Sequence, residues 1–240
     1  CTRARQVLDP FCGIELDSPL VTAARCALLV GNPTATDRVA DDYEDLIDLA
    51  PLQQRHIRAL GHHMLPQWFG SYDALELEAR RTAARTQDIW GAGAYTWICM
   101  DAILMDDTAC AEIEASLFIE GMRDILARSP DQHTANLLAA YCSVSIRATY
   151  GSDDAADLIR CQLMQCADWI IRDHLTEIQP LVWARAGGRF DASDRTQAVQ
   201  KLADRGRRDA LDAISALFGE DFAFGSGVAF PSGQSVINLR

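Results

Sequence analysis

The chain has 240 residues, of which 49% are hydrophobic and 23% charged, so its composition predicts a folded protein rather than a disordered one. Acidic residues outnumber basic ones by 34 to 22, which gives a formal net charge of −12. This balance argues against nucleic acid as a partner, because phosphate contacts need clustered lysine and arginine. No apolar run approaches the roughly 18 residues of a membrane span, so we expect no membrane partner either.

Helix signals follow one another along the first half of the chain. Ser18-Pro19 places a capping residue before a proline, which is favourable at the first helical position, and predicts a helix to residue 30. Asp73 with Glu76 three residues later predicts a capping box at the start of another helix. With breaks assigned to proline and glycine, the expected helices are 18–30, 37–50, 51–65, 73–89 and 94–105.

The second half continues the same pattern, with Asp131 and Asp153 at plausible helix starts. Ile159, Leu163, Cys166 and Ile170 recur at the spacing of a buried helical stripe. The expected helices are 106–128, 129–151, one from 152 onward, and 193–218, the last with a weak point at Gly206. Pro180 and Gly187-Gly188 predict a short connection between the last two. Residues 220–240 are glycine-rich and aperiodic, with a short strand expected at 235–239. No stretch alternates in the manner of a sheet, so we predict an all-α, single-domain bundle of about eight helices over 1–219, followed by an irregular C-terminal tail over 220–240.

Cysteine usage bears on the compartment. The eight cysteines include no CxxC pair, and most lie in apolar helical segments, so we expect buried free thiols in a reducing compartment such as the cytoplasm. The chain begins at Cys1 without a methionine, which leaves its localisation open. Cys1 as an N-terminal nucleophile is disfavoured, because enzymes of that kind are rich in strands.

The most informative local feature is an acidic stripe on one helix. Asp41, Glu44, Asp45 and Asp48 are spaced by three, four and seven residues, which puts their carboxylates on one face. Like charges this close repel, so the stripe is either solvated or neutralised by a cation or a basic partner. The opposite face is apolar, with Val39, Tyr43, Leu46, Ile47 and Ala50. The pattern predicts an amphipathic helix with a solvated acidic side.

The same segment, Asp41-Asp42-Tyr43-Glu44-Asp45, spells DDxxD. It is similar to the metal-binding motif of class I isoprenoid diphosphate enzymes, which are all-α bundles. The resemblance implies that Asp41, Asp42 and Asp45 hold Mg²⁺ against a diphosphate, a role suited to oxygen ligands. It covers five residues. The family's second metal motif, an asparagine, serine and glutamate on a facing helix, has no match in the nearest segment, 168–177.

A second group of aromatic and acidic residues has two interpretations. Trp90, Tyr95 and Trp97 precede Asp101, Asp106 and Asp107 in the sequence. In one interpretation they line an apolar cavity with acids at its mouth, which would suit a diphosphate with an apolar tail. In the other, which we favour, the aromatic residues belong to the core and Asp106-Asp107 cap the next helix.

Histidines and arginines supply weaker candidates. His56 and His63 share a helix face, but their spacing matches no metal motif. Arg80, Arg81 and Arg85 decorate one helix, and Arg205, Arg207 and Arg208 another. We interpret both clusters as solvated faces or as ion pairs with the abundant aspartates. If the diphosphate interpretation holds, one of them grips the ligand.

Two functions follow, from different classes. The first, which we favour, is a non-catalytic protein-binding or structural assembly component whose acidic surface suits a basic protein partner. It needs no cofactor, and we also consider homo-oligomers formed through the tail. The second is a Mg²⁺-dependent enzyme that acts on a diphosphate through Asp41, Asp42 and Asp45. We favour the first because the sequence contains no complete catalytic set.

Overall fold

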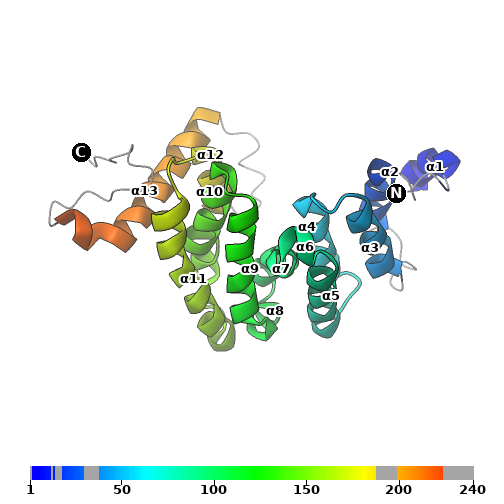
Figure 1. Ribbon diagram of the computed structural model, residues 1–240, viewed down its shortest axis with the longest axis horizontal. Coiled ribbons are helices and arrows are strands. Elements are labelled where there is room, and N and C mark those ends of the chain that lie inside the picture. The colour runs from blue at the N-terminus through cyan, green and yellow to red at the C-terminus, as the bar shows by residue number, and fades with distance from the viewer. Residues whose placement is uncertain (1, 12, 14–17, 30–37, 188–198, 224–240) are drawn as a thin grey trace. The chain divides into compact units, whose positions relative to one another are not determined.

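The computed structural model describes residues 2–11, 13, 18–29, 38–187 and 199–223. Over these ranges the chain forms 13 α-helices and three short 3-10 or π segments, and no strand, which confirms the predicted all-α class (Figure 1). There are more helices than the eight or so expected. Residues 224–240, most of the predicted tail, lie outside the described ranges, as does the strand predicted at 235–239.

The chain divides into two compact units, Cys1–Asp124 and Ile125–Arg240, and the boundary falls within one helix, α9. Unit 1 contains α1 (Thr2–Leu8), η1 (Asp9–Phe11), α2 (Pro19–Ala27), α3 (Val39–Leu49), α4 (Gln54–His63), α5 (Tyr72–Arg85), α6 (Gln87–Trp90), α7 (Gly93–Met105), α8 (Asp107–Glu112) and the start of α9 (Ala115–Arg128). Unit 2 contains α10 (Gln132–Ala140), the π-helical η4 (Tyr141–Ser145), η5 (Arg147–Thr149), α11 (Asp154–His174), α12 (Pro180–Gly187) and α13 (Val199–Ala223).

The core of unit 1 is built around α7. This helix is apolar on all sides, and Tyr95 and Trp97 are fully buried within it. Helix α4 crosses α7 so closely that a Cβ on Gly61 would lie 1.9 Å from the carbonyl oxygen of Ile98. The ring of Trp90 packs edge-on against Trp97. The interpretation of these aromatic residues as core is therefore confirmed. The close crossing fixes the position of α4 on α7, and α3 and α5 pack against α4.

The core of unit 2 contains a neutral polar network centred on Asn136. Its side-chain oxygen accepts hydrogen bonds from the Gln179 backbone N–H and from Trp183 Nε1, both at 2.8 Å. Its amide nitrogen donates to the carbonyl oxygens of Gln132 and Glu177. The asparagine is fully buried, so these bonds satisfy a side chain that water cannot reach. The network ties α10 to α12 and to the segment between α11 and α12.

Helix starts show where capping was predicted correctly. Asp106, Asp131 and Asp153 each accept a hydrogen bond from the backbone N–H three residues on, as expected of N-caps. The capping box at Asp73 is wrong. Ser71 caps α5 instead, and Glu76 bonds to Arg80 rather than back to the helix start.

Several expected helices are divided. Residues 106–128 form α8 and α9 with a break at Ile113 and Glu114, and 129–151 passes from α10 into the π segment η4. The segment around Pro180, expected to be a connection, is helix α12. The weak point predicted at Gly206 is a close crossing, where an added Cβ would lie 1.8 Å from the Pro180 carbonyl oxygen.

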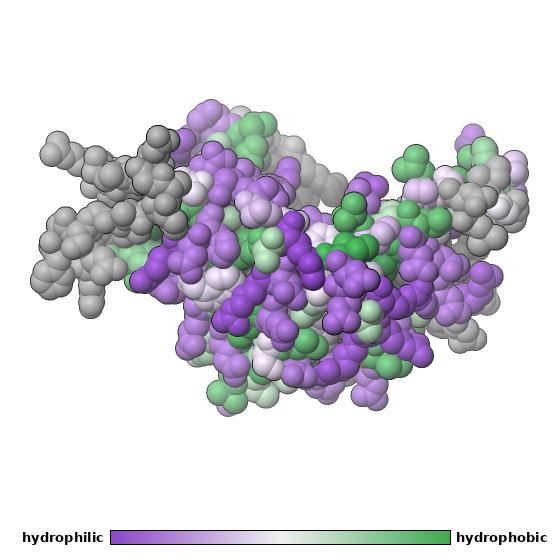
Figure 2. Space-filling view, in the orientation of Figure 1, coloured by the Kyte–Doolittle hydropathy of each residue, from purple (hydrophilic) through white to green (hydrophobic). Residues whose placement is uncertain are grey.

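The surface and the cysteines complete the fold. Hydrophilic residues cover most of the described surface on the face that Figure 2 shows. None of the described helices is both long and apolar enough to cross a membrane. The cysteines in the described ranges are free thiols, and all but Cys161 are buried, in agreement with the prediction.

Candidate functional site

Helix α3 is amphipathic, as its sequence predicts. Val39, Tyr43, Leu46 and Ile47 are buried against the rest of unit 1. On the other side Asp41, Asp45 and Asp48 are exposed, whereas Asp42 and Glu44 are half-buried. Asp41 and Asp42 lie in the first turn, where the helix dipole favours negative charge. The stripe is therefore an outward-facing acidic surface.

Arginines neutralise part of this stripe. Arg85, at the end of α5, forms ion pairs with both Glu44 and Asp48. Arg38 pairs with Asp42 at 3.2 Å within the first turn of α3. Among the described residues, no ion pair reaches Asp41 or Asp45. The interpretation of Arg85 as a partner for aspartate is confirmed, and two carboxylates of the stripe stay available to an outside cation.

Asp42 is the most constrained carboxylate of the group. Burial raises its pKa, and repulsion from Asp45 and Asp41 adds to the rise, while Arg38 opposes it. The backbone carbonyl of Asp42 accepts a hydrogen bond from the Cys26 thiol at 3.3 Å. Burial raises the pKa of that thiol to about 12, so Cys26 stays protonated at neutral pH.

The three predicted magnesium ligands lie on the outer side of one helix. Asp41 and Asp45 are exposed, and Asp42 is engaged by Arg38. Within the described part of the chain, no three His, Cys, Asp or Glu side chains are grouped so as to hold a metal ion. Neither observation tests binding itself, so the magnesium site at Asp41, Asp42 and Asp45 stays a prediction.

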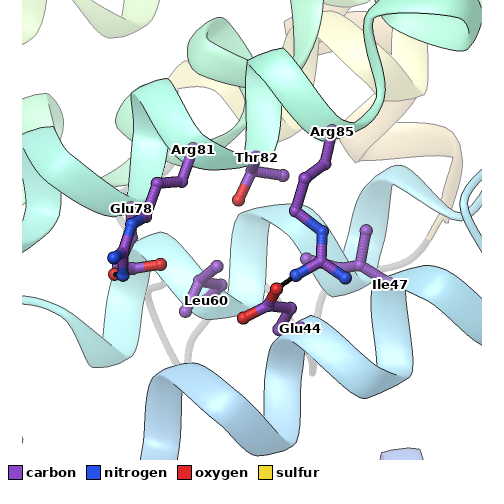
Figure 3. Close-up of a pocket in the computed structure, with 7 residues that line it drawn as sticks. All are labelled: Glu44, Ile47, Leu60, Glu78, Arg81, Thr82 and Arg85. Atoms are coloured by element: carbon purple, nitrogen blue, oxygen red, sulfur yellow. Dashed lines mark hydrogen bonds and ion pairs between the residues drawn. The ribbon is translucent and has the colours of Figure 1, made fainter.

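A slot lies beside the stripe, between α3, α4 and α5 (Figure 3). Its free volume is about 10 Å³, which is at the limit of what one water molecule needs. Its floor is apolar, formed by Ile47 of α3 and Leu60 of α4, both buried. The remaining lining residues are Glu44, Glu78, Arg81, Thr82 and Arg85. An ion pair stands at each end: Glu78 with Arg81, and Glu44 with Arg85.

Two polar residues of the slot belong to the buried side of α5. Glu78 and Thr82 are only 8% and 6% exposed, and they lie one turn apart on the same face as Leu75 and Ala79. Sequence reasoning missed them. The sequence did contain a signal for them. A glutamate and a threonine occupy positions of the apolar stripe, where a buried polar group needs a hydrogen-bond partner.

The three acids that could have lined the mouth of an aromatic cavity, Asp101, Asp106 and Asp107, have other roles. Asp101 forms a two-pronged ion pair with Arg58 of α4, at 2.5 and 2.9 Å. Asp106 caps α8 and accepts a hydrogen bond from the Tyr72 hydroxyl. Asp107 lies in the first turn of α8. These acids therefore link and cap helices.

The two conspicuous histidines are parts of the core. His63 donates from Nδ1 to the Ala59 carbonyl oxygen at 2.7 Å, and its Nε2 is buried without a hydrogen-bond partner in the described residues. The ring stacks on Phe69, and burial lowers its pKa. Burial also lowers the pKa of His56. The structure does not bring the two histidines together into a metal site with the acidic stripe.

Comparisons with protein-family models, with curated proteins and with solved structures found no match. The acidic stripe on α3 is therefore the feature from which we infer function.

Proposed function

We propose that this chain is a non-catalytic protein-binding component that engages a basic partner through the outer face of α3. The observation that carries the proposal is the uneven neutralisation of the acidic stripe. Glu44 and Asp48 already have an arginine, whereas Asp41 and Asp45 are exposed and lack an ion pair in the described structure.

The shape of α3 supports the proposal. Its apolar side is buried in the core, so the helix cannot rotate its carboxylates inward without exposing Val39 and Leu46 to water. The acidic side therefore faces outward as a preformed surface. With a net charge of −12, the chain attracts cationic partners over distances of about a Debye length, roughly 8 Å at physiological salt.

The test is binding of a fluorescein-labelled nonalysine peptide, followed by fluorescence anisotropy. We expect saturable binding that weakens as salt rises, because surface charge pairs are screened. Asp41→Asn combined with Asp45→Asn removes two charges from the stripe. We expect this double variant to weaken binding by about tenfold, on the order of two surface charge pairs.

The matched control is Glu112→Gln combined with Glu120→Gln. These glutamates are also exposed, lie in the same unit, and carry the same total charge. If the control weakens nonalysine binding as much as the stripe variant does, attraction is a property of net charge alone and the proposed surface is wrong.

The diphosphate enzyme remains the untested alternative, and no described contact favours it over protein binding. It predicts that Mg²⁺ and inorganic pyrophosphate together raise the melting temperature, because a ligand that binds only the folded state stabilises it. Asp42→Asn and Asp45→Asn would each abolish that shift. A shift that needs both additives would replace protein binding with the enzyme as the better account.

A further inference from the structure

We propose that acid opens the segment 66–70 of unit 1, between α4 and α5, while the helices around it stay folded, and that His63 is the group that takes up the proton. The inference goes beyond the proposed function and does not depend on it, because His63 contacts the inner side of α3 rather than the acidic stripe.

His63 lacks a hydrogen bond at one of its two ring nitrogens. Nδ1 lies 2.7 Å from the carbonyl oxygen of Ala59, which can only accept, so Nδ1 carries the hydrogen of the neutral ring. Nε2 is then an acceptor, and it is buried without a hydrogen-bond partner among the described residues. The whole residue is only 7% exposed. A proton at Nε2 would place a positive charge and a donor where the described structure offers no acceptor, so the closed structure resists protonation.

The titratable neighbours of the ring do not offset such a charge. The Tyr43 hydroxyl of α3 lies 3.2 Å from Nδ1, the nitrogen that is already bonded. His62 of α4 contacts the ring edge-on and would repel a positive charge. Segment 66–70, with the sequence PQWFG, has no titratable side chain. Burial is the main cause that lowers the pKa of His63, and its hydrogen bond to the backbone opposes the change.

The segment 66–70 covers part of the imidazole ring. Phe69 stacks on His63, with the ring planes 13° apart and the centroids 6.0 Å apart, and the centroid of the Trp68 ring lies 6.5 Å away. Phe69 is half-buried, whereas Trp68 is 39% exposed. Movement of the segment away from α4 would remove these two rings from His63 and expose the imidazole to water.

Few interactions hold the segment in place. The backbone N–H groups of Trp68 and Gly70 donate to the carbonyl oxygen of Leu65, at 2.9 and 3.4 Å, and that of Phe69 donates to His63 at 3.2 Å. Leu65 itself is fully buried and belongs to the core. Segments with few hydrogen bonds and little buried surface open at a lower free energy than the whole domain. The segment can therefore open without unfolding of α4 or α7.

Proton linkage gives the direction and the size of the effect. In the open segment the ring is in water, where the pKa of an imidazole is about 6.5, whereas its pKa in the closed structure is lower. The closed state is therefore fully favoured above about pH 6.5 and loses ground as the pH falls. Between about pH 7.5 and pH 5.0 the ratio of open to closed chains rises by at most about thirtyfold, the limit for one proton bound only in the open state.

Hydrogen exchange measured by NMR tests the proposal, with each rate divided by that of an unfolded chain at the same pH. The amides of Trp68, Phe69 and Gly70 should lose about tenfold of their protection between about pH 7.5 and pH 5.0, and should stay less protected than the amides of α7. His63→Phe keeps a ring against Phe69 and should reduce the loss to about twofold or less. The matched control, His62→Gln, removes the neighbouring imidazole instead and should keep most of the loss.

Gly70→Ala provides an opposite test. An added Cβ at this position would lie 2.1 Å from the carbonyl oxygen of Met64, so the segment cannot stay folded back on the end of α4. Its amides should then be poorly protected at neutral pH, while those of α7 remain protected. Unchanged protection of the segment in this variant would contradict the closed arrangement. Circular dichroism establishes that each variant is folded.

The native chain supplies a second measurement that needs no variant. With labelled histidine, the imidazole signals of His63 should titrate below about pH 6.5, together with the amide signals of segment 66–70. Titration of His63 at or above that pH would overturn the proposal. So would a loss of protection that survives His63→Phe, or one that the segment shows only together with α7.

Failure of the acidic surface to bind a basic partner would leave this inference intact, since neither the variants nor the measurements involve Asp41 or Asp45.

Discussion

Separate helices in unit 1 are joined by ion pairs near the surface, whereas separate helices in unit 2 are joined by a neutral amide in the core. Arg85 reaches from α5 to α3, and Arg58 reaches from α4 to α7. The ion pairs that the structure describes within unit 2 lie inside α11, and Asn136 links its neighbours instead.

The difference bears on what each unit can do. A buried, fully bonded network fixes one geometry, because any alternative leaves polar groups unpaired away from water. Half-exposed ion pairs contribute little to stability, and their partners exchange readily with other charges. The half-exposed charges of unit 1 can therefore change partners without disturbing the core.

Asn136→Ala should destabilise the protein by about 3 kcal/mol, because it leaves the Gln179 N–H and Trp183 Nε1 without their acceptor in the core. Urea unfolding measures the change. Gln200→Ala, which removes an exposed amide bonded to Asp204 in the same unit, should have little effect. A loss below about 1 kcal/mol for Asn136→Ala would show that the network is not a major source of stability.

Arg58 and Asp101 should show a smaller coupling. Their side chains are 30% and 22% exposed, so water screens the pair in part. A double-mutant cycle with Arg58→Ala and Asp101→Ala should give a coupling free energy of about 1 kcal/mol. The coupling should fall in ~1 M NaCl, where the Debye length is about 3 Å. Coupling as large as the effect of Asn136→Ala and insensitive to salt would contradict the contrast between the units.

His63 makes unit 1 sensitive to acid. Its pKa is lower in the folded state than in the unfolded state, whose value is about 6.5. The unfolded chain therefore takes up a proton at pH values where the folded chain does not, so stability is full above about pH 6.5 and falls as pH decreases toward the folded pKa. Tyr43, which is neutral, and His62 are the titratable groups that contact the ring.

His63→Phe keeps a ring on Phe69 and removes the titrating group. We expect it to reduce the loss of stability between about pH 7 and pH 5, with His56, whose pKa is also lowered, accounting for part of what remains. Melting temperatures measured across that range give the slope. His133→Gln, at an exposed position, should leave the slope as in the native chain. An unchanged slope in His63→Phe would refute the assignment.

Asp41→Asn combined with Asp45→Asn should have the smallest effect on stability, because relief of their repulsion opposes the loss of the favourable interaction of Asp41 with the start of α3. The two carboxylates are one turn apart on α3, and like charges at this spacing repel by up to about 0.5 kcal/mol. Differential scanning calorimetry should show little change in melting temperature. A clear fall would mean that the two residues form contacts within the fold, and the stripe could not then be described as free for a partner.

Local patterns in the sequence predicted many of the helices and the orientation of α3. The caps at Asp131 and Asp153 and the buried face with Val39 and Leu46 follow from interactions within one or two turns. Ser71 and Asp73 are both good caps, so the choice between them was not determined locally. The helix formed by α12 was missed because proline and glycine mark both its first turn and its end.

The slot required long-range information. Arg85 and Glu44 are 41 residues apart, and no local rule brings α5 beside α3. The crossing of α4 and α7 at Gly61 sets the position of α4. The crossing is possible because Gly61 has no side chain, and the neighbouring sequence does not indicate that a helix passes there. Glu78 and Thr82 can be recognised as lining the slot only when Leu60 and Ile47 are seen to lie opposite them.

A ¹H–¹⁵N correlation titration of the labelled chain with unlabelled nonalysine would locate, residue by residue, the surface that binds a basic partner. Binding at the proposed surface should give chemical-shift changes concentrated at α3, with one saturation curve for all affected amides. Changes that follow exposed acids throughout the chain, including Asp153 and Asp154 of unit 2, would contradict it.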